Sequence, residues 1–394
     1  MKKHTLHALL SILKSDLLKN SFIIFLSFLG AGVITFLAEL FLSKSLGPVD
    51  WGQFRTVVYL FTFSQLLIEL GINVTLTKYV AEYKNKSKGK IGYLVKSLLK
   101  IRLFSYSFVI LLILVLRDYL SLTFLGSASL GYLFIGSIFF IGFSFFSTIG
   151  FIVLGYQKFK LFAKSQFLIS ISSAILAILM SPLGIFYTII GWSFGFLLGN
   201  IINIRFFLSN KTIEDTEKFD VKKLFWKFSI PIYITNIPNV LFSFVIPFLN
   251  LFFSPLLVGY YSFAFIFYSA SLLIPRSISY VVFPKVSELD GVNKHRDAKE
   301  ILKKSFIPYS FVFLVGLLLI FSASDWLFGS FFTEYLPSIM IFKVLSVTGL
   351  GFGFLTIYVN YLQGLGRIKM IFLVALIQNL SLLFISFYLL SSMS

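Results

Sequence analysis

The sequence predicts an all-α protein that crosses the membrane many times, and three observations carry this prediction. Hydrophobic residues make up 58% of the chain and charged residues only 13%, whereas soluble domains are about half apolar and a quarter charged. The apolar residues gather in long runs of the length that spans a bilayer as a helix. Most Lys and Arg residues lie in the short segments between these runs.

Residues 1–19 form a separate segment before the first long apolar run. Leucines recur there at helical spacing between four lysines, which predicts an amphipathic helix on the cytoplasmic face of the membrane. Charges interrupt its apolar stretch and no small-residue cleavage site follows, so the segment is not a cleavable signal peptide.

Eleven apolar segments follow, and each is long enough to form a spanning helix. We expect a first lobe of six helices at 20–208, a cytoplasmic linker at 209–224, and a second lobe of five helices at 225–394. The segments cover residues of about 20–43, 51–77, 95–117, 128–155, 161–181, 184–208, 225–253, 256–284, 304–323, 332–362 and 368–391.

The distribution of basic residues predicts the orientation. With the N-terminus inside, 29 of the 34 Lys and Arg residues fall in or beside the cytoplasmic connections. Cytoplasmic loops carry such an excess in membrane proteins. We therefore expect a multi-pass protein of the cell inner (cytoplasmic) membrane with a cytoplasmic N-terminus. The same distribution argues against nucleic-acid binding, despite a net charge of +18.

The two lobes repeat one plan at an offset of about 207 residues. Gly52 follows a Pro-containing turn, and Gly259 follows a similar turn 207 residues later. Gly155 and Gly364 end corresponding segments at an offset of 209. This regularity indicates an internal duplication. Because both lobes begin inside, they are parallel repeats related by an axis along the membrane normal. The repeat also predicts a twelfth helix, for which the sequence contains no segment.

Several kinds of chemistry are excluded or disfavoured. The chain contains no Cys, and its three His residues, at positions 4, 7 and 295, lie outside the apolar segments. A thiolate site or a His-based metal site within the membrane is therefore excluded. No Walker sequence and no nucleophile–His pair occurs in the spans, so we expect neither an enzyme nor a bound cofactor.

One stretch resembles a known family of transporters. Leu46-Gly47-Pro48-Val49-Asp50-Trp51-Gly52-Gln53-Phe54, then Glu69-Leu70-Gly71-Ile72-Asn73 running into Lys78-Tyr79-Val80-Ala81, looks like the polysaccharide-biosynthesis flippases (Wzx-like, O-antigen flippases). Leu154-Gly155-Tyr156-Gln157-Lys158 fits the same family.

The family belongs to the multidrug/oligosaccharidyl-lipid/polysaccharide (MOP) exporter superfamily. Resemblance to it implies two lobes in a V, like the MATE extruders, with a central cavity and alternating access. It also implies a substrate, namely an O-antigen, capsule or other repeat unit on a polyprenyl diphosphate. An ion gradient of protons or sodium would drive transport. Expected partners are the lipid-linked oligosaccharide, membrane lipids, and a polysaccharide polymerase and glycosyltransferases.

Charged residues inside the apolar segments are candidates for function, because they are costly in lipid. Lys343 lies near the middle of its segment and could bind the diphosphate, although a structural partner for it is an alternative. Arg276 is a second candidate contact for the substrate, and it aligns with Glu69 at the offset of 207. We expect Glu69 and Arg276 to close a cytoplasmic gate, and Glu39 and Arg55 to form its outer counterpart. Pairing within a lobe is the alternative. The two glutamates are also the candidates for ion coupling.

The seventh segment combines prolines with amides. Pro231, Pro238 and Pro247 predict that the helix bends or breaks, since each removes a backbone donor. Asn236 and Asn239 beside the break are candidate contacts for sugar hydroxyls, with helix–helix hydrogen bonding as the alternative. Two other functions remain open: a cation-coupled multidrug extruder of the same superfamily, and a non-transporting membrane subunit of a polysaccharide assembly complex.

Overall fold

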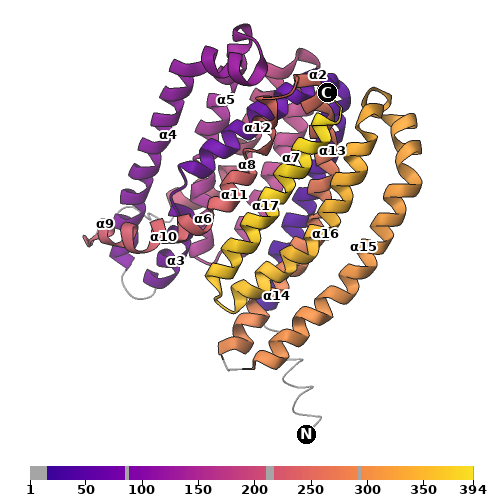
Figure 1. The fold of residues 1–394 in the computed structure, drawn as a ribbon. Helices are drawn as coiled ribbons and strands as arrows, with labels where there is room; N and C mark the ends of the chain where they lie inside the picture. The colour runs from indigo at the N-terminus through magenta and orange to yellow at the C-terminus, as the bar shows by residue number, and fades with distance from the viewer. Residues whose placement is uncertain (1–15, 85–87, 210–216, 292–293, 394) are drawn as a thin grey trace.

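The chain folds into a bundle of long helices (Figure 1). The computed structural model describes residues 16–84, 88–209, 217–291 and 294–393, and this part of the chain contains no strand. Most of the predicted amphipathic segment, residues 1–15, lies outside the described residues. Below, the first half of the molecule means α2 to α8, and the second half means α9 to α17.

The first half consists of α2 Asp16–Leu67, α3 Ile72–Tyr83, α4 Lys88–Leu125, η1 Ala128–Leu130, α5 Gly131–Ser144, α6 Ser147–Gly155, α7 Phe159–Met180, η2 Ser181–Leu183 and α8 Ile185–Ser209. The second half consists of α9 Val221–Leu224, η3 Phe225–Ser229, α10 Ile230–Thr235, α11 Ile237–Phe242, α12 Val245–Asn250, α13 Pro255–Ser271, α14 Leu273–Gly291, α15 His295–Phe331, η4 Thr333–Ser338, α16 Ile339–Gly364 and α17 Ile368–Ser391.

The structure has the features of a multi-pass membrane protein. Nine stretches of the described chain are long and apolar enough to cross a membrane. The first of them contains a kink, because Gly47 has a positive φ of 74° and Pro48 follows it. This kink lies at the turn that the sequence predicts between the first two segments. The division into six and five spanning helices remains a prediction.

The run from α9 to α12 is broken, as its prolines predict. Four short α-helices and the π-helical turn η3 replace one continuous helix between Val221 and Asn250. The start of this run lies against the first half: Val221 is buried with Ile72 and Leu94, and the backbone N–H of Glu217 donates to the carbonyl of Gly89 at 3.0 Å. The run therefore begins on the first half, and its end, α12, contacts both α13 and α2.

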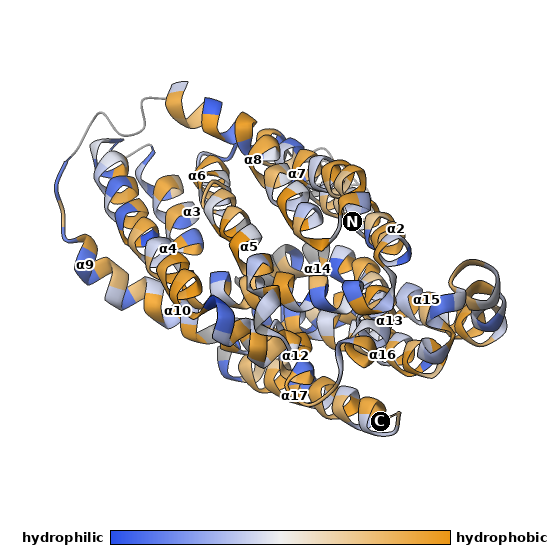
Figure 2. Ribbon diagram, turned by 90° about the horizontal axis from the view of Figure 1, so that it is seen from above, coloured by the Kyte–Doolittle hydropathy of each residue, from blue (hydrophilic) through white to orange (hydrophobic). Residues whose placement is uncertain are grey.

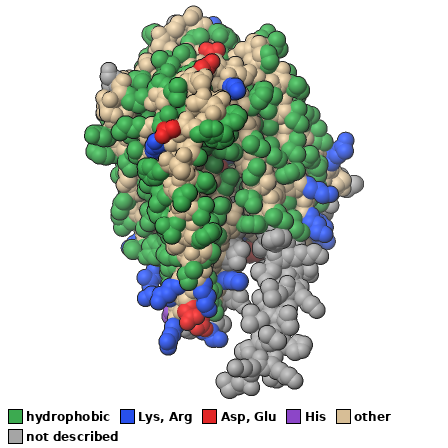
Figure 3. Space-filling model, turned by 90° about the vertical axis from the view of Figure 1, so that its right-hand side faces the viewer, with side chains coloured by type: hydrophobic (Ala, Val, Ile, Leu, Met, Phe, Trp, Pro, Cys, Tyr) green, Lys and Arg blue, Asp and Glu red, His purple; other side chains and the backbone are tan. Residues whose placement is uncertain are grey.

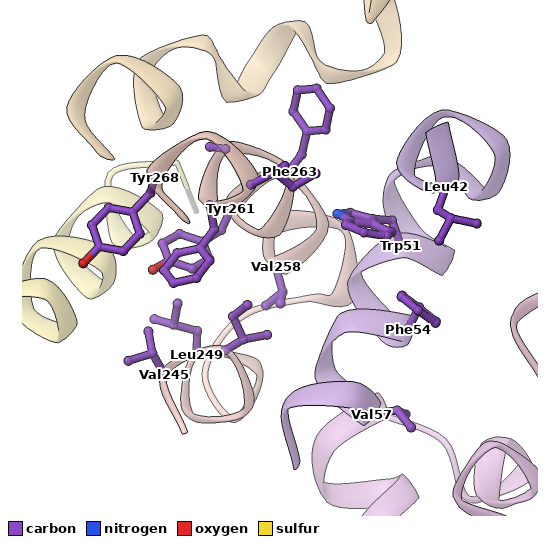
Figure 4. Close-up of a cluster of buried hydrophobic side chains, with 14 of the residues drawn as sticks. Leu42, Trp51, Phe54, Val57, Val245, Leu249, Val258, Tyr261, Phe263 and Tyr268 are labelled. Atoms are coloured by element: carbon purple, nitrogen blue, oxygen red, sulfur yellow. The ribbon is translucent and has the colours of Figure 1, made fainter. Parts of the chain in front are cut away.

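The largest hydrophobic core joins the two halves. Trp51 and Phe54 of α2 and Val258 and Phe263 of α13 are almost fully buried in one cluster, and Figure 4 shows these side chains on neighbouring helices. Burying such aromatic side chains is strongly favourable. Because residues more than 200 positions apart share this core, the two halves are held together along α2 and α13.

A reciprocal backbone contact lies beside this core. A Cβ atom on Gly52 would overlap the carbonyl oxygen of Pro255, and a Cβ atom on Gly259 would overlap that of Pro48. Each glycine thus packs against the proline of the other repeat. Only glycine permits so close an approach. The alignment of Gly52 with Gly259 predicted from the sequence corresponds to this symmetric contact.

The outer surface is apolar in a way that suits lipid. On the face in Figure 3, hydrophobic side chains cover the middle, and most Lys and Arg side chains gather toward the lower end. Seen from above in Figure 2, the helices carry hydrophobic residues around much of their circumference. Phe311 and Phe384 are 70% and 73% exposed. Exposed apolar surface on this scale is typical of a membrane-embedded protein.

Candidate functional site

Arg276 lies in α14 between two cavities. The helix is interrupted at Leu272, between α13 and α14. Pro275 precedes the arginine in the first turn of α14. The Arg276 side chain is exposed and lines both cavities. It forms no hydrogen bond or ion pair with any side chain that the structure describes. An arginine without a counter-charge in a membrane protein is costly and marks a functional position.

The first cavity, here called the inter-half cavity, has a volume of about 210 Å³. It is lined from α2 and from the second half of the molecule, including Thr35, Glu39, Arg55, Tyr59, Ser269 and Arg276. It therefore lies where the two halves meet.

Glu39 and Arg55 form a buried ion pair on the wall of the inter-half cavity. Arg55 Nη1 donates to Glu39 Oε1, and both residues are less than 10% exposed. Both belong to α2, so the pair lies within one lobe, as the alternative has it, and its role as an outer gate stays a prediction. The second guanidinium nitrogen of Arg55 donates to the hydroxyl of Tyr59 at 3.1 Å. The guanidinium also lies 5.2 Å from the ring centre of Trp51. Each charge of this buried pair compensates the other. Removing one partner would leave an uncompensated buried charge.

The second cavity, here called the second-half cavity, has a volume of about 170 Å³. Its polar wall comes from Thr356 and Asn360 of α16 and from Gln378 and Asn379 of α17. Phe242, Tyr268 and Arg276 complete it from α11, α13 and α14. The two cavities share Arg276, so a ligand at the guanidinium could extend into either one.

Lys343 forms an ion pair with Asp325, and its predicted contact with a diphosphate stays a prediction. Its ammonium nitrogen lies 3.2 Å from a carboxylate oxygen of Asp325, and the Asp325 side chain is 72% exposed. Lys343 is not among the residues that line the inter-half cavity or the second-half cavity. Because Asp325 on α15 is within reach of α16, the lysine has the structural partner that the sequence left as the alternative. Arg276, itself a predicted substrate contact, is the charged residue that lines both cavities.

Glu69 and Arg276 are not paired in this structure. The Glu69 carboxylate instead accepts hydrogen bonds from the backbone N–H groups of Gly71 at 2.9 Å and Asn73 at 2.7 Å. The cause is a helix break: Leu70 and Gly71 have φ angles of 51° and 72°, and α3 begins directly afterwards. The first N–H groups of a helix have no partners within it, and a carboxylate satisfies them.

The two predicted asparagines lie at the break between α10 and α11. The backbone N–H of Asn236 donates to the carbonyl of Tyr233 at 2.9 Å, and Asn236 is not among the residues lining either cavity. The side chain of Asn239 lies outside the described residues. Their predicted contact with sugar hydroxyls stays a prediction.

Four polar residues near these features are absent from the predicted set. Asn360, Gln378 and Asn379 form the polar wall of the second-half cavity; the adjacent amides at 378 and 379, inside an apolar segment, were the available signal. Arg102 is 3% exposed and donates to the carbonyl of Ile68 at 3.0 Å and to the hydroxyl of Tyr106 at 3.3 Å. It satisfies the end of α2 next to the break at Leu70. Within the described part of the chain, no group of three His, Asp or Glu residues could hold a metal ion.

Comparison with known proteins identifies the family and the fold. The profile of a family described as "Polysaccharide biosynthesis protein" matches residues 17–290, which is more than half of the chain. No curated protein sequence matches the chain.

Solved structures with the same fold are transporters. An inward-facing multidrug resistance MATE family transporter of the MOP superfamily has a TM-score of 0.65 at 13% identity, covering 92% of this chain and 94% of its own. The lipid II flippase MurJ, in an inward closed conformation, has a TM-score of 0.64 at 18% identity, covering 92% and 79%. The eukaryotic MATE transporter AtDTX14 has a TM-score of 0.61 at 16% identity, covering 95% and 94%. This protein belongs to the polysaccharide biosynthesis protein family and has the all-helical MOP-superfamily fold, as its sequence predicts.

Proposed function

We propose that the protein is a flippase that moves an oligosaccharide linked to a polyprenyl diphosphate across the membrane by alternating access. The observation that carries this proposal is Arg276, an arginine without an ion-pair partner among the described residues, placed where two cavities meet. A guanidinium binds phosphate oxygens in a bidentate geometry and stays charged when buried. Arg276 therefore supplies the charge that a diphosphate needs when it leaves water.

The family and the fold support the same substrate class. The chain belongs to a polysaccharide biosynthesis family, and one structure with its fold is a lipid II flippase. The repeat unit would belong to O-antigen, capsule or another polysaccharide. The protein would then work in the cell inner membrane with its N-terminus in the cytoplasm, beside a polysaccharide polymerase and glycosyltransferases.

The buried pair of Glu39 and Arg55 is the proposed point of coupling to an ion gradient. Glu39 lines the inter-half cavity, so a proton or sodium ion entering this cavity could compete with Arg55 for the carboxylate. Weakening the pair would loosen the wall between the two halves. The pair would thus act both as a gate and as the ion-coupling element.

A transport assay tests the proposal. The protein is reconstituted in liposomes with a fluorescent polyprenyl-diphosphate oligosaccharide, and access of a reagent to the sugar is followed on each leaflet, with and without proton and sodium gradients. We expect transfer that depends on the protein and falls at least about tenfold in Arg276→Ala, as expected for loss of a charged hydrogen bond. Arg276→Lys should retain part of the rate.

Two further variants make the result specific. Arg117→Ala removes an exposed arginine in the C-terminal half of α4 and should leave transfer unchanged. Lys343→Ala tests the other cation that the sequence proposes, and we expect a smaller loss than in Arg276→Ala. A wild-type protein that moves a cationic dye but no lipid-linked saccharide would establish the multidrug extruder instead. Transfer that is equally fast in Arg276→Ala would remove Arg276 from the site.

A further inference from the structure

The second-half cavity has the chemistry of a sugar site. We propose that it is the saccharide subsite of the transporter and holds the sugar ring next to the diphosphate. This inference rests on the proposed function, because it takes the diphosphate to lie at Arg276. It adds a specificity site, formed by Asn360, Gln378 and Asn379, to a cavity that would otherwise recognise charge alone.

The amides of this cavity have unused hydrogen-bonding capacity. Asn360 Nδ2 donates to the carbonyl of Thr356 at 2.9 Å, and Asn379 Nδ2 donates to the carbonyl of Pro238 at 2.7 Å. These bonds fix both side chains while leaving each amide oxygen free to accept, and one N–H of each free to donate. The side chain of Gln378, within α17, forms no hydrogen bond with another group that the structure describes. Sugar hydroxyls, which both donate and accept, match this set.

The apolar part of the wall also suits a sugar. Phe242 and Tyr268 lie on one side of the cavity, with ring centres 6.4 Å apart. Amphipathic aromatic surface of this kind can pack against the C–H face of a pyranose ring. Binding sites with a few convergent polar groups on an apolar, aromatic wall are typical for small polar ligands.

The charge of the cavity argues against a cationic occupant. No Asp or Glu is among its lining residues, and its one charged group is Arg276. A cationic drug or a bound metal ion would be repelled by the guanidinium and would find no carboxylate there. A neutral sugar attached to a diphosphate fits both the amides and the arginine of the cavity. The sugar ring would hydrogen-bond to the amides, and the phosphates would bind the guanidinium.

Size and position are consistent with one ring beside the diphosphate. The volume of about 170 Å³ corresponds to several water molecules, at about 30 Å³ per water in the liquid, which a single pyranose ring can replace. Because Arg276 also lines the inter-half cavity, a diphosphate at the guanidinium can carry its sugar into the second-half cavity. Further sugars of the repeat unit would occupy the inter-half cavity.

The test separates sugar recognition from diphosphate recognition. Binding of three probes to the purified full-length protein is measured: a short-chain polyprenyl diphosphate, the same carrier with one hexose, and the same carrier with one N-acetylhexosamine. We expect at least one of the sugar-bearing probes to bind more tightly than the bare carrier. Asn360→Leu and Gln378→Leu should abolish this preference, weakening the sugar-bearing probe about five- to tenfold, the effect of one or two lost hydrogen bonds. Both variants should bind the bare carrier like the wild type.

Control variants test whether the loss of sugar preference is specific to the amides of the second-half cavity. Gln363→Leu removes an exposed amide at the end of α16, away from the lining of this cavity, and should change none of the three affinities. Asn360→Ala removes the amide without adding a larger apolar side chain if a leucine variant fails to fold, and it should also remove the preference for sugar. Arg276→Ala should instead weaken all three probes.

The outcomes distinguish the two levels of the proposal. If the wild-type protein binds the bare carrier but shows no preference for either sugar-bearing probe, the subsite is wrong and the flippase remains. Equal weakening of all three probes in the amide variants would likewise remove the subsite. If the wild-type protein binds none of the three probes, the proposed function itself fails, and the subsite fails with it.

Discussion

Two regions that the predicted duplication makes equivalent differ in their packing: one forms a close backbone contact, and the other lines a cavity. In the first half, Gly71 of the α2–α3 break packs on η3: a Cβ atom there would overlap the carbonyl oxygen of Ser229, and Thr75 Oγ1 lies 2.7 Å from Ser229 Oγ. We call this the α3–η3 contact. At the offset of 207, the counterparts of Gly71 and Thr75 are Ile278 and Val282, which line an open cavity of about 450 Å³ between α2, α14 and α15. We call this the α2–α14 cavity.

The difference follows from single side chains. Glycine at position 71 lets two backbones touch, whereas isoleucine at position 278 adds a branched side chain where such a contact would form. The same comparison explains why Glu69 and Arg276, which also align at the offset of 207, have different surroundings. The break after α2 engages the carboxylate of Glu69 with backbone N–H groups. In α14 the helix continues, and the charge of Arg276 remains available to the cavities.

The strongest test of this comparison is Gly71→Ala. Alanine would be strained at a φ of +72° by about 1 kcal/mol, and its overlap with the Ser229 carbonyl would add about 2 kcal/mol or more. We expect a total loss of about 3 kcal/mol, measured by thermal unfolding in detergent. Gly126→Ala is the control, because Gly126 has a φ of +74° and no atom within 4 Å of an added Cβ. Equal losses in both variants would mean that the α3–η3 contact contributes nothing.

Arg102→Met should have the next largest effect. The substitution leaves the partly buried carbonyl of Ile68 without its partner, which costs about 2 kcal/mol. Thermal unfolding measures the loss, and Arg117→Met, at an exposed position, should change stability by less than about 0.5 kcal/mol. A fully stable Arg102→Met protein would show that the α2–α3 break does not depend on this arginine.

Glu69→Gln should lower stability by about 1 kcal/mol, because the charge that faces the first N–H groups of α3 is lost. A double reversal, Glu69→Arg with Arg276→Glu, then asks whether the two residues depend on each other. We expect no recovery of transport over the single variants, since the two groups have different partners in this structure. Recovery would establish the predicted gate pair in another conformation.

The smallest effect is expected for Ile278→Ala. Its side chain faces the α2–α14 cavity and is only partly buried, so the loss should stay below about 1 kcal/mol. Ile357 is fully buried in α16, and Ile357→Ala should cost about 2 to 5 kcal/mol. Comparable losses in the two variants would mean that the cavity is closed in solution.

The sequence predicts features that depend on local pattern. Long apolar runs predict the helices, the prolines at 231, 238 and 247 predict the broken run, and the repeat predicts that Gly52 and Gly259 are equivalent positions. Glu39 and Arg55 were predictable as a pair, because both lie near the same end of adjacent segments. Each of these features can be predicted from hydrophobic periodicity, from turn residues or from residues close together along the chain.

Other features depend on how helices rotate against one another. Whether Lys343 faces a cavity or Asp325 is decided by the orientation of α16 beside α15, which hydropathy does not encode. The capping role of Glu69 follows from positive φ angles at Leu70 and Gly71. A leucine in the sequence does not predict such a helix break. The second-half cavity joins amides of α16 and α17 to Arg276 of α14, so it exists only after tertiary packing.

The reciprocal contact of Gly52 and Gly259 has an evolutionary consequence. Each glycine meets a main-chain carbonyl of the other repeat, and a carbonyl cannot be made smaller by mutation. A larger residue at either position therefore has no compensating substitution in its partner, unlike a mismatch between two side chains. If the predicted repeats arose by duplication, they diverged at Glu69 and Arg276, but at this one place each repeat restricts the mutations that the other can accept.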